Sequence, residues 1–416
     1  MLLREHKKAL TLSSLGGLLE FYDFIIYALL AGYLSQLFFP ETSSINGLLA
    51  VFSAYAVGYF ARPFGGLIFG HFGDKYGRKK TFTISILMMA LSTLLIGLLP
   101  TYETIGALAP VLLVIFRIFQ GISVGGEIPG AITYISEIAP EKKGFMTGTI
   151  FCFLIAGVAV GFIVEAVLLT IYTHQVMLDW AWRIPFILGG IFGLVAYYLR
   201  RQLMDIKSFR PFIEKEFALP VTKLLKTQLW NFIYGTVLVS FGALAFVTLF
   251  IFLPSYISKV LSLKLSNFIW MNSLGVIILS ILCIAIGFCA DKMSKTVLLV
   301  ISCVLLLFLP TVIYGIYISQ ASYYFYAILL SAIVCAFCWG NIPAILVELY
   351  QQDVRYTGIG FAYNLGFAVF GGLTPLIVLS VIKVTHDVSA PSYVLAVGSI
   401  ITLIFIVLNS IIKRVK

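Results

Sequence analysis

Residues 70–80 read GHFGDKYGRKK and lie between two long apolar stretches. The glycines permit a tight turn between two helices, and the basic cluster at the end of the stretch favours the anionic cytoplasmic leaflet of a membrane. A degenerate copy begins at Gly287, 217 residues after Gly70, and repeats the aspartate and the lysine at the same spacing. The recurrence predicts two related halves that face each other across the middle of a membrane.

The composition excludes a water-soluble fold. Of the 416 residues, 61% are hydrophobic and 11% are charged, and the mean hydropathy is +1.04, whereas soluble domains have about 25% charged residues. A membrane-spanning helix needs about 20 mostly apolar residues. Such stretches lie at 10–38, 45–72, 81–100, 105–136, 145–172, 181–200, 229–253, 265–290, 296–319, 322–347, 358–383 and 392–412. We therefore expect an all-α integral membrane protein with twelve transmembrane helices.

Lysine and arginine are unevenly distributed between the two sets of loops. Of the 28, 22 lie in the segments expected on the side of the N-terminus, and three lie in the opposite loops. Because basic residues favour the cytoplasmic side, we expect a multi-pass protein of the cell inner membrane with both termini in the cytoplasm. The longest polar segment, 200–228, is expected to be a cytoplasmic linker. It would join an N-terminal six-helix bundle at 1–199 to a C-terminal six-helix bundle at 229–416.

The spacing within residues 70–80 resembles the signature loop of the major facilitator superfamily, and the copy at 287–295 lies where that family has its second loop. Other stretches resemble its metabolite:proton symporter branch, which includes proline/betaine, ketoglutarate, shikimate and citrate carriers. They are EFYDF at 20–24, RPFGG at 62–66, the segment 117–127, RYTG at 355–358, and the segments 363–364 and 370–372. The resemblance covers essentially the whole chain. It implies two six-helix bundles related by pseudo-twofold symmetry and transport coupled to protons.

Ionisable residues inside the expected spans are few. Each needs a partner, a cavity or a function, because a charge at bilayer depth costs at least about 2.5 kcal/mol. Glu20 and Asp23 share one face of the first span near the middle of the bilayer, with Tyr27 one turn beyond. In the fourth span, Arg117 lies at a similar depth and Gln120 continues its stripe. We therefore expect an acid of the first span, above all Asp23, to meet Arg117 at the midplane.

Such a pair would couple proton binding to substrate binding. The acid stays ionised beside Arg117, and it takes a proton when the arginine leaves it or binds a substrate anion. The alternative is a permanent structural ion pair between Asp23 and Arg117. In the fifth span, Glu165 is a second proton site, a substrate contact or an acid that reaches the periplasmic water. The expected proton-coupling residues are Asp23, Glu20, Arg117 and Glu165.

The second half of the chain has no ionisable residue well inside an expected span. It must therefore contact a substrate through neutral groups. The expected substrate contacts, from both halves, are Tyr27, Arg117, Gln120, Trp339, Asn341, Tyr363 and Asn364. Ordinary helix packing is an equally good interpretation of the aromatic residues among them.

Residues near the cytoplasmic ends of the helices are expected to form a gate between the halves. Arg62 and Glu127 lie nearer that side than Arg117, where they either brace the gate or pair structurally. The expected gate residues are Gly70, Asp74, Arg78, Glu127, Glu137, Asp291 and Glu348.

The residues and the resemblance together predict a secondary active transporter for proton-coupled uptake of a small organic solute. Buried arginines suit a carboxylate or a zwitterion such as proline or betaine. We expect no enzyme activity, no catalytic residue, no metal site and no cofactor, because the chain has neither an ATP-binding P-loop nor a zinc-protease motif. The proton gradient would drive transport. The expected partners are the solute, protons and the lipid bilayer, without nucleic acid, and the chain is expected to be a monomer. A proton-driven exporter or antiporter, and a non-transporting membrane sensor with the same fold, are the alternatives.

Overall fold

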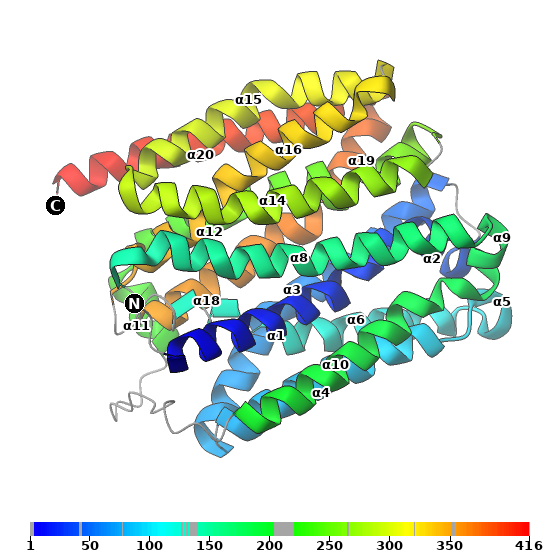
Figure 1. The fold of residues 1–416 in the computed structure, drawn as a ribbon, viewed down its shortest axis with the longest axis horizontal. Helices are drawn as coiled ribbons and strands as arrows, with labels where there is room; N and C mark the ends of the chain where they lie inside the picture. The colour runs from blue at the N-terminus through cyan, green and yellow to red at the C-terminus, as the bar shows by residue number, and fades with distance from the viewer. Residues whose placement is uncertain are drawn as a thin grey trace.

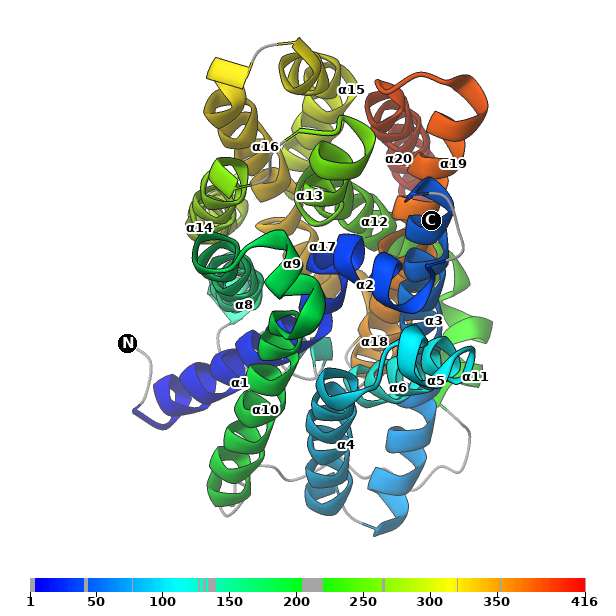
Figure 2. The ribbon, with the colours of Figure 1, turned by 90° about the vertical axis from the view of Figure 1, so that its right-hand side faces the viewer.

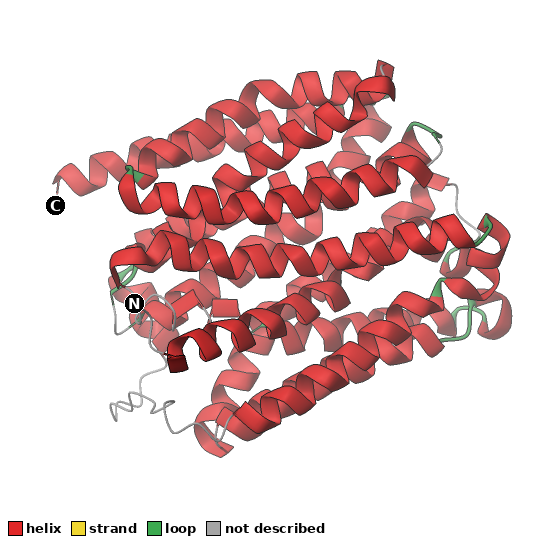
Figure 3. Cartoon of the chain, in the orientation of Figure 1, coloured by secondary structure: helices red, strands yellow, loops and turns green. Residues whose placement is uncertain are grey.

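The structure is a computed structural model. It describes residues 4–40, 44–76, 78–125, 128–129, 132–133, 140–203, 220–263, 266–319, 321–351 and 354–415. Within these ranges the chain is helical and contains no strand (Figure 3).

The helices follow one another closely along the chain. They are α1 (Arg4–Leu29), α2 (Ala31–Phe38), α3 (Ser44–Tyr76), α4 (Arg78–Leu98), α5 (Tyr102–Ile105), α6 (Leu108–Val124), η1 (Pro140–Lys142), α8 (Lys143–Ile171), α9 (His174–Val176), η2 (Met177–Ala181), α10 (Arg183–Leu203), α11 (Pro220–Thr227), α12 (Leu229–Phe246), η3 (Val247–Ile251), α13 (Leu253–Ser255), η4 (Tyr256–Val260), α14 (Ser266–Lys292), α15 (Lys295–Ser319), η5 (Ala321–Tyr323), α16 (Tyr324–Trp339), α17 (Ile342–Leu349), α18 (Arg355–Gly366), η6 (Phe367–Gly372), α19 (Leu373–Thr385) and α20 (Ala390–Val415).

Each of the twelve expected apolar stretches overlaps at least one of these helices. Among the described residues, seven helices are long and apolar enough to cross a membrane, and up to nine if each bent pair counts as one span. One bent pair is α1 and α2, which meet at an angle of 58°. The first expected span is therefore broken near Leu30 instead of running straight.

The long helices run roughly along one axis, and α1 begins at the same end of the molecule at which α20 ends (Figure 1). We call this end the terminal face and the other end, where α8 finishes, the opposite face. The outward surface between them is apolar. Side chains such as Phe308 on α15, Ile281 on α14 and Val407 on α20 are more than half exposed. Only lipid can cover such a surface, so the packing agrees with a membrane protein.

The expected linker is partly helical. Helix α10 continues as far as Leu203, and α11 forms just before α12. The part of the segment between them, 204–219, lies outside the described residues.

Glycines allow the helices around the centre of the molecule to pack closely. A Cβ atom at Gly121 of α6 would clash with the backbone of Gly58 on α3, and one at Gly65 would clash with Ile122. Between the two halves of the chain, α8 and α14 lie side by side (Figures 1 and 2), and a side chain at Gly144 or Gly287 would strike the other helix. The close contact of α3 with α6 places two arginines, one from each helix, in the interior.

Candidate functional site

Arg117 of α6 is completely buried. Its Nη1 donates a hydrogen bond to Oε1 of Gln120 at 2.8 Å and a longer one to the carbonyl oxygen of Phe24 at 3.4 Å. The guanidinium lies 4.4 Å from the ring centres of both Phe24 and Tyr27. Gln120 in turn donates to Oγ1 of Thr93 at 2.7 Å, so Arg117 is held by a network of hydrogen bonds and aromatic rings.

The expected ion pair between Asp23 and Arg117 is wrong for this structure. Both residues are described, and they do not form an ion pair. The Asp23 carboxylate instead packs against Gly189 and Gly193 of α10, where the absence of side chains leaves room for it. The rings of Phe24 and Tyr27 occupy the space beside Arg117 that the acid was expected to fill. Spacing along a helix places residues on a face, but it does not say which neighbouring helix that face meets.

A cavity lies between the two halves of the chain. Its walls are mostly apolar and come from both halves, including Phe24, Val158, Phe246 and Phe367. Two ionisable side chains, Glu20 of α1 and Arg62 of α3, also line it. Glu20 is thus placed at the centre, as expected. Arg62 is also central and does not lie only at the gate, because α3 runs unbroken for 33 residues through Pro63 and places the arginine beside the cavity.

Arg62 is held differently from Arg117. Its guanidinium lies 5.3 to 5.8 Å from the ring centres of Phe24, Tyr59, Tyr363 and Phe367. Its Nε and Nη2 atoms are buried and have no hydrogen-bond partner in the described structure. Buried donors without partners are costly, so this guanidinium is suited to accept a ligand that brings oxygen atoms to it.

The second half of the chain contributes aromatic residues to the same place. Trp339 stacks on Phe151 at 5.1 Å and on Phe367 at 5.4 Å, and Tyr363 lies 4.8 Å from Phe367. The Trp339 Nε1 and the Tyr363 hydroxyl are buried, with no hydrogen-bond partner among the described residues. The second half thus also has buried hydrogen-bond donors without described partners, and they lie beside Phe367, whose ring contacts Arg62.

Three other expected substrate contacts have protein partners. Tyr27 donates its hydroxyl proton to the carbonyl oxygen of Val51, at 3.1 Å. Asn364 donates to the carbonyl oxygen of Gly125, joining α18 to the end of α6. Asn341 lies at the terminal-face end of α16, where its Nδ2 donates to the carbonyl oxygen of Lys295 at 2.8 Å. Asn341 therefore belongs to the closure of that face and lies apart from the cavity lining.

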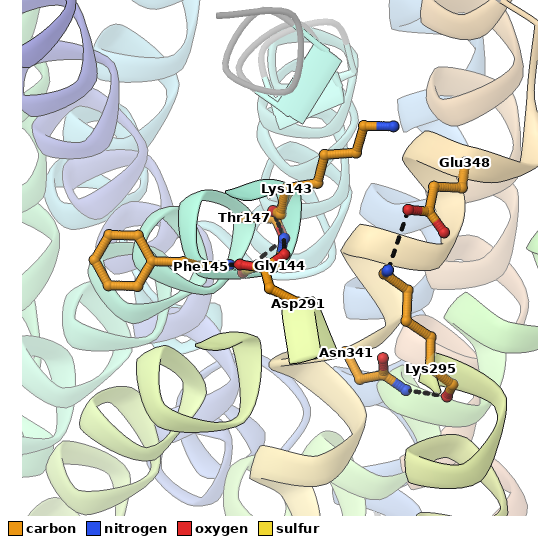
Figure 4. A network of polar contacts seen from close by, with 8 residues as sticks. All are labelled: Lys143, Gly144, Phe145, Thr147, Asp291, Lys295, Asn341 and Glu348. Carbon is orange, nitrogen blue, oxygen red and sulfur yellow. Dashed lines mark hydrogen bonds and ion pairs between the residues drawn. The ribbon is translucent and has the colours of Figure 1, made fainter. Parts of the chain in front are cut away.

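The terminal face is closed by polar contacts between the halves (Figure 4). Asp291 at the end of α14 accepts hydrogen bonds from the backbone N–H groups of Gly144 and Phe145, at 2.7 and 2.9 Å. The carboxylate thus caps the beginning of α8, where the helix dipole favours negative charge. Within the second half, Lys295 pairs with Glu348 at 3.1 Å.

The other expected gate residues are described less fully. Gly70 and Asp74 lie in α3 and Arg78 begins α4, but their side chains are outside the described part of the structure. Glu127 and Glu137 lie outside the described residues altogether. Of the gate residues, Asp291 and Glu348 are the two whose contacts can be followed.

The opposite face is closed as well, by contacts of another kind. Lys383 donates to Oδ1 of Asn46 at 3.0 Å, and Trp270 Nε1 donates to Oγ1 of Thr170 at 3.2 Å. Phe52 also meets Phe252, with ring centres 5.7 Å apart. Contacts between the halves thus lie at both ends, and the cavity is enclosed between them.

Glu165 lies apart from this cavity. It is buried in α8 towards the opposite face and does not line the cavity with Glu20 and Arg62. The structure therefore places the four expected proton-coupling residues in different surroundings: Glu20 at the cavity, Asp23 at α10, Arg117 in its hydrogen-bonded network and Glu165 in α8.

Some residues of the site were missed by sequence reasoning. Tyr59 and Phe367 line the cavity, Tyr55 covers Arg117, and Thr93 completes its network. The sequence did indicate the two tyrosines of α3. Tyr55, Tyr59 and Arg62 follow one another at steps of four and three residues, so they share one face of the helix. For Thr93 we find no such signal.

Known proteins resemble the chain in sequence and in fold. The profile of the Major Facilitator Superfamily matches residues 14–375. A putative proline/betaine transporter of Staphylococcus aureus strain COL is 32% identical, over 96% of this chain and 87% of that protein. The proline/betaine transporter of Escherichia coli K12 is 31% identical, over 96% of this chain and 82% of that protein.

Solved structures show the same fold. The partially occluded, inward-open conformation of the xylose transporter XylE from E. coli superimposes with a TM-score of 0.74, over 96% of both chains at 16% identity. A D-xylose-proton symporter structure gives a TM-score of 0.71, over 94% of this chain and 96% of that one, at 17% identity. Its sequence, its relatives and its fold thus agree that this chain belongs to the major facilitator superfamily and is a multi-pass membrane transporter.

Proposed function

We propose that this chain takes up a small zwitterion that carries a carboxylate, together with protons, by alternating access. The observation that carries the proposal is a set of buried donors, of which Arg62 lines the cavity, while Tyr363 and Trp339 lie behind its lining, beside Phe367. Arg62 offers Nε and Nη2, and Tyr363 and Trp339 offer their hydroxyl and indole N–H, all without hydrogen-bond partners. A carboxylate bound at Arg62 would satisfy both guanidinium atoms, in the paired geometry that arginine favours.

The rest of the cavity suits the positive end of a zwitterion. The rings of Phe24, Tyr59 and Phe367 line it, and aromatic faces attract ammonium groups. Glu20 adds a carboxylate to the same wall. Proline and betaine each carry a carboxylate and a positively charged nitrogen. Both of the relatives described above are named as proline/betaine transporters.

The two halves of the chain touch each other at both faces, on either side of the cavity, and this arrangement supports alternating access. Because Arg62 comes from the first half of the chain and Tyr363 and Trp339 from the second, a ligand among them draws the halves together. We place this carrier in the cell inner membrane as a monomer with both termini in the cytoplasm. The excess of lysine and arginine on the side of the termini supports that orientation. The terminal face is then cytoplasmic and the opposite face is periplasmic. The proton gradient, without a cofactor, supplies the driving force.

Uptake by proteoliposomes tests this function. Purified protein is reconstituted, a gradient acidic outside is imposed, and accumulation of labelled betaine and proline is compared with that of a dicarboxylate. We expect accumulation of a zwitterion that a protonophore abolishes. Accumulation only under a gradient of the reverse sign identifies an exporter. Binding without transport identifies a sensor.

A further inference from the structure

Glu165 is a buried acid that the cavity does not use. Its side chain is 2% exposed, and neither carboxylate oxygen has a hydrogen-bond partner in the described structure. It also forms no ion pair with any described cation. It lies six residues before the end of α8, which is about 9 Å along the helix axis from the opposite face. A carboxylate in such a place is strongly disfavoured when ionised and much less so when protonated.

A short path leads from this acid to the surface. The end of α1 packs on α8 one turn before Glu165, where a side chain at Gly161 would touch Leu29. Tyr33, the third residue of α2, follows directly and is within electrostatic reach of the Glu165 carboxylate. The Tyr33 ring is 5.2 Å from the ring of His174, which is exposed at the start of α9. Both groups can pass protons, and histidine is a frequent proton shuttle. The 58° bend between α1 and α2 turns Tyr33 into this position.

Other charged groups on the surrounding elements are engaged elsewhere. Asp23 faces α10, and Glu20 lines the cavity. Arg183 lies 4.3 Å from the Trp182 ring, and Asp179 accepts a hydrogen bond from Gln175. Lys259 of the second half is nearer, because the end of its side chain packs against Gly32, next to Tyr33, but it forms no ion pair with Glu165. The part of α14 that packs on α8 has no acidic or basic residue between Phe268 and Ala290. Tyr33 is thus the titratable neighbour of Glu165.

Glu165 lies on the side of α8 that borders the space between the halves. Phe151, which stacks on Trp339 of the second half, Val158 of the cavity lining and Glu165 follow one another at steps of seven residues and so share one face. Near the opposite face, Lys259 of the second half packs against Gly32, next to Tyr33. When the halves separate there, water reaches this end of α8 and the carboxyl can ionise. When they close, the carboxyl loses that water and gains no protein partner. Closure and protonation are therefore linked equilibria.

We propose that Glu165 takes up the coupling proton from the outer side, through Tyr33 and His174, and that its protonation permits the opposite face to close. The inference rests on the proposed symport, because it names the residue that binds the proton. It assigns proton binding to the periplasmic half of α8, away from Arg62 and the bound solute.

Cysteine labelling tests the inference without any substrate. Ile251 lines the cavity and is 1% exposed, so Ile251→Cys reacts with a membrane-impermeant maleimide from outside only when the opposite face opens. In right-side-out vesicles we expect labelling to be about tenfold faster in mildly alkaline than in mildly acidic buffer, a ratio typical of coupled sites. The parent without the new cysteine corrects for the six native cysteines.

Adding Glu165→Gln, a neutral mimic of the protonated acid, should make labelling slow in both buffers. Two matched controls should keep the pH difference: Glu103→Gln, an exposed acid on α5, and Asp23→Asn, a buried acid facing α10. His174→Ala should also keep it, because the acid that titrates is unchanged. An unaltered pH difference in Glu165→Gln overturns the inference, as does a loss confined to His174→Ala or Asp23→Asn.

Transport assays separate the role of Glu165 from the proposed function, because each can fail without the other. Glu165→Gln should exchange betaine across the membrane at a rate near that of the parent, but should lose accumulation driven by a pH gradient. If the parent itself transports no zwitterion, the proposed function fails, while labelling still decides the role of Glu165. If Glu165→Gln accumulates betaine like the parent, the proton site lies elsewhere and the symport stands.

Discussion

Arg62 and Arg117 lie on adjacent helices and touch the same ring, that of Phe24, but they are held in different ways. Arg117 is fixed by hydrogen bonds to Gln120 and to a backbone carbonyl, behind the cavity lining. Arg62 lines the cavity, and aromatic rings surround it while two of its nitrogens find no partner. Nε and Nη2 of Arg117 also lack hydrogen-bond partners among the described residues, so unpaired nitrogens alone do not separate the two residues. The difference teaches that position decides: the arginine that lines the cavity can serve a ligand, whereas the one behind the lining, with Nη1 bonded to the protein, serves the fold.

The largest effect is expected for Arg62. Arg62→Ala should lower betaine uptake by about 100-fold, because hydrogen bonds to a charged group contribute about 1.5 to 3 kcal/mol. Arg62→Lys should recover little of it, because lysine cannot present two nitrogens in one plane. Initial rates in proteoliposomes, corrected for the amount of reconstituted protein, measure the effect. Full uptake by Arg62→Ala would remove this residue from the substrate site.

Arg117 should affect stability more than substrate affinity. Arg117→Ala removes the bond to Gln120 and the contacts with Phe24 and Tyr27, and should cost about 2 to 4 kcal/mol of stability. The midpoint of thermal unfolding in detergent should fall, while the KM of the folded fraction should stay near that of the parent. A KM raised as much as in the Arg62 variants, at unchanged stability, would place Arg117 at the substrate.

At the terminal face, Asp291 is a charge whose two carboxylate oxygens both accept hydrogen bonds from the protein. Asp291→Ala removes two hydrogen bonds at the beginning of α8 and should weaken that closure by about 1 to 2 kcal/mol. The expected result is a population shifted towards the form open at the terminal face, seen as faster alkylation of the native Cys283, which is buried on α14 where Gly148 of α8 packs against it. Unchanged alkylation would show that the cap does not hold the face closed.

The smallest effect is expected for the ion pair of Lys295 with Glu348. The Glu348 side chain is 44% exposed, and exposed pairs contribute about 0 to 1 kcal/mol. Glu348→Gln should therefore leave uptake within about twofold of the parent, measured beside Asp291→Ala. A loss of uptake as large as that of Asp291→Ala would mean that the ion pair of Lys295 with Glu348 acts as part of the gate.

Much of the fold was predictable from the sequence. The loop at 70–80, its copy at 287 and the apolar stretches predicted the superfamily fold, because helix formation and turn geometry depend on local residues. The bend at Leu30 was not predicted, because Gly32, two residues further on, is also compatible with a straight helix in an apolar stretch. The helical ends of the 200–228 segment were also missed, because charge alone suggested a loop.

The site was predictable only in part. Glu20 lines the cavity, and Trp339 and Tyr363 lie beside Phe367 of its lining, so the structure places these three residues where their predicted roles are possible. The roles themselves stay predictions. Asp23 was assigned the wrong partner, and Asn341, predicted as a substrate contact, donates instead to the carbonyl oxygen of Lys295. Both errors concern the rotation of a helix and its packing against others, which depend on contacts between distant segments. The importance of Arg62 follows from its position in the cavity lining, where two of its nitrogens lack described partners, and only the structure reveals that position.

One binding experiment tests the central claim most directly. Betaine and choline share the same ammonium head, but choline lacks the carboxylate. Binding of both is measured by quenching of tryptophan fluorescence, for the parent and for Arg62→Ala. We predict that the parent prefers betaine by at least about tenfold and that Arg62→Ala binds the two about equally. An undiminished preference for betaine in Arg62→Ala would contradict the assignment of the carboxylate to Arg62.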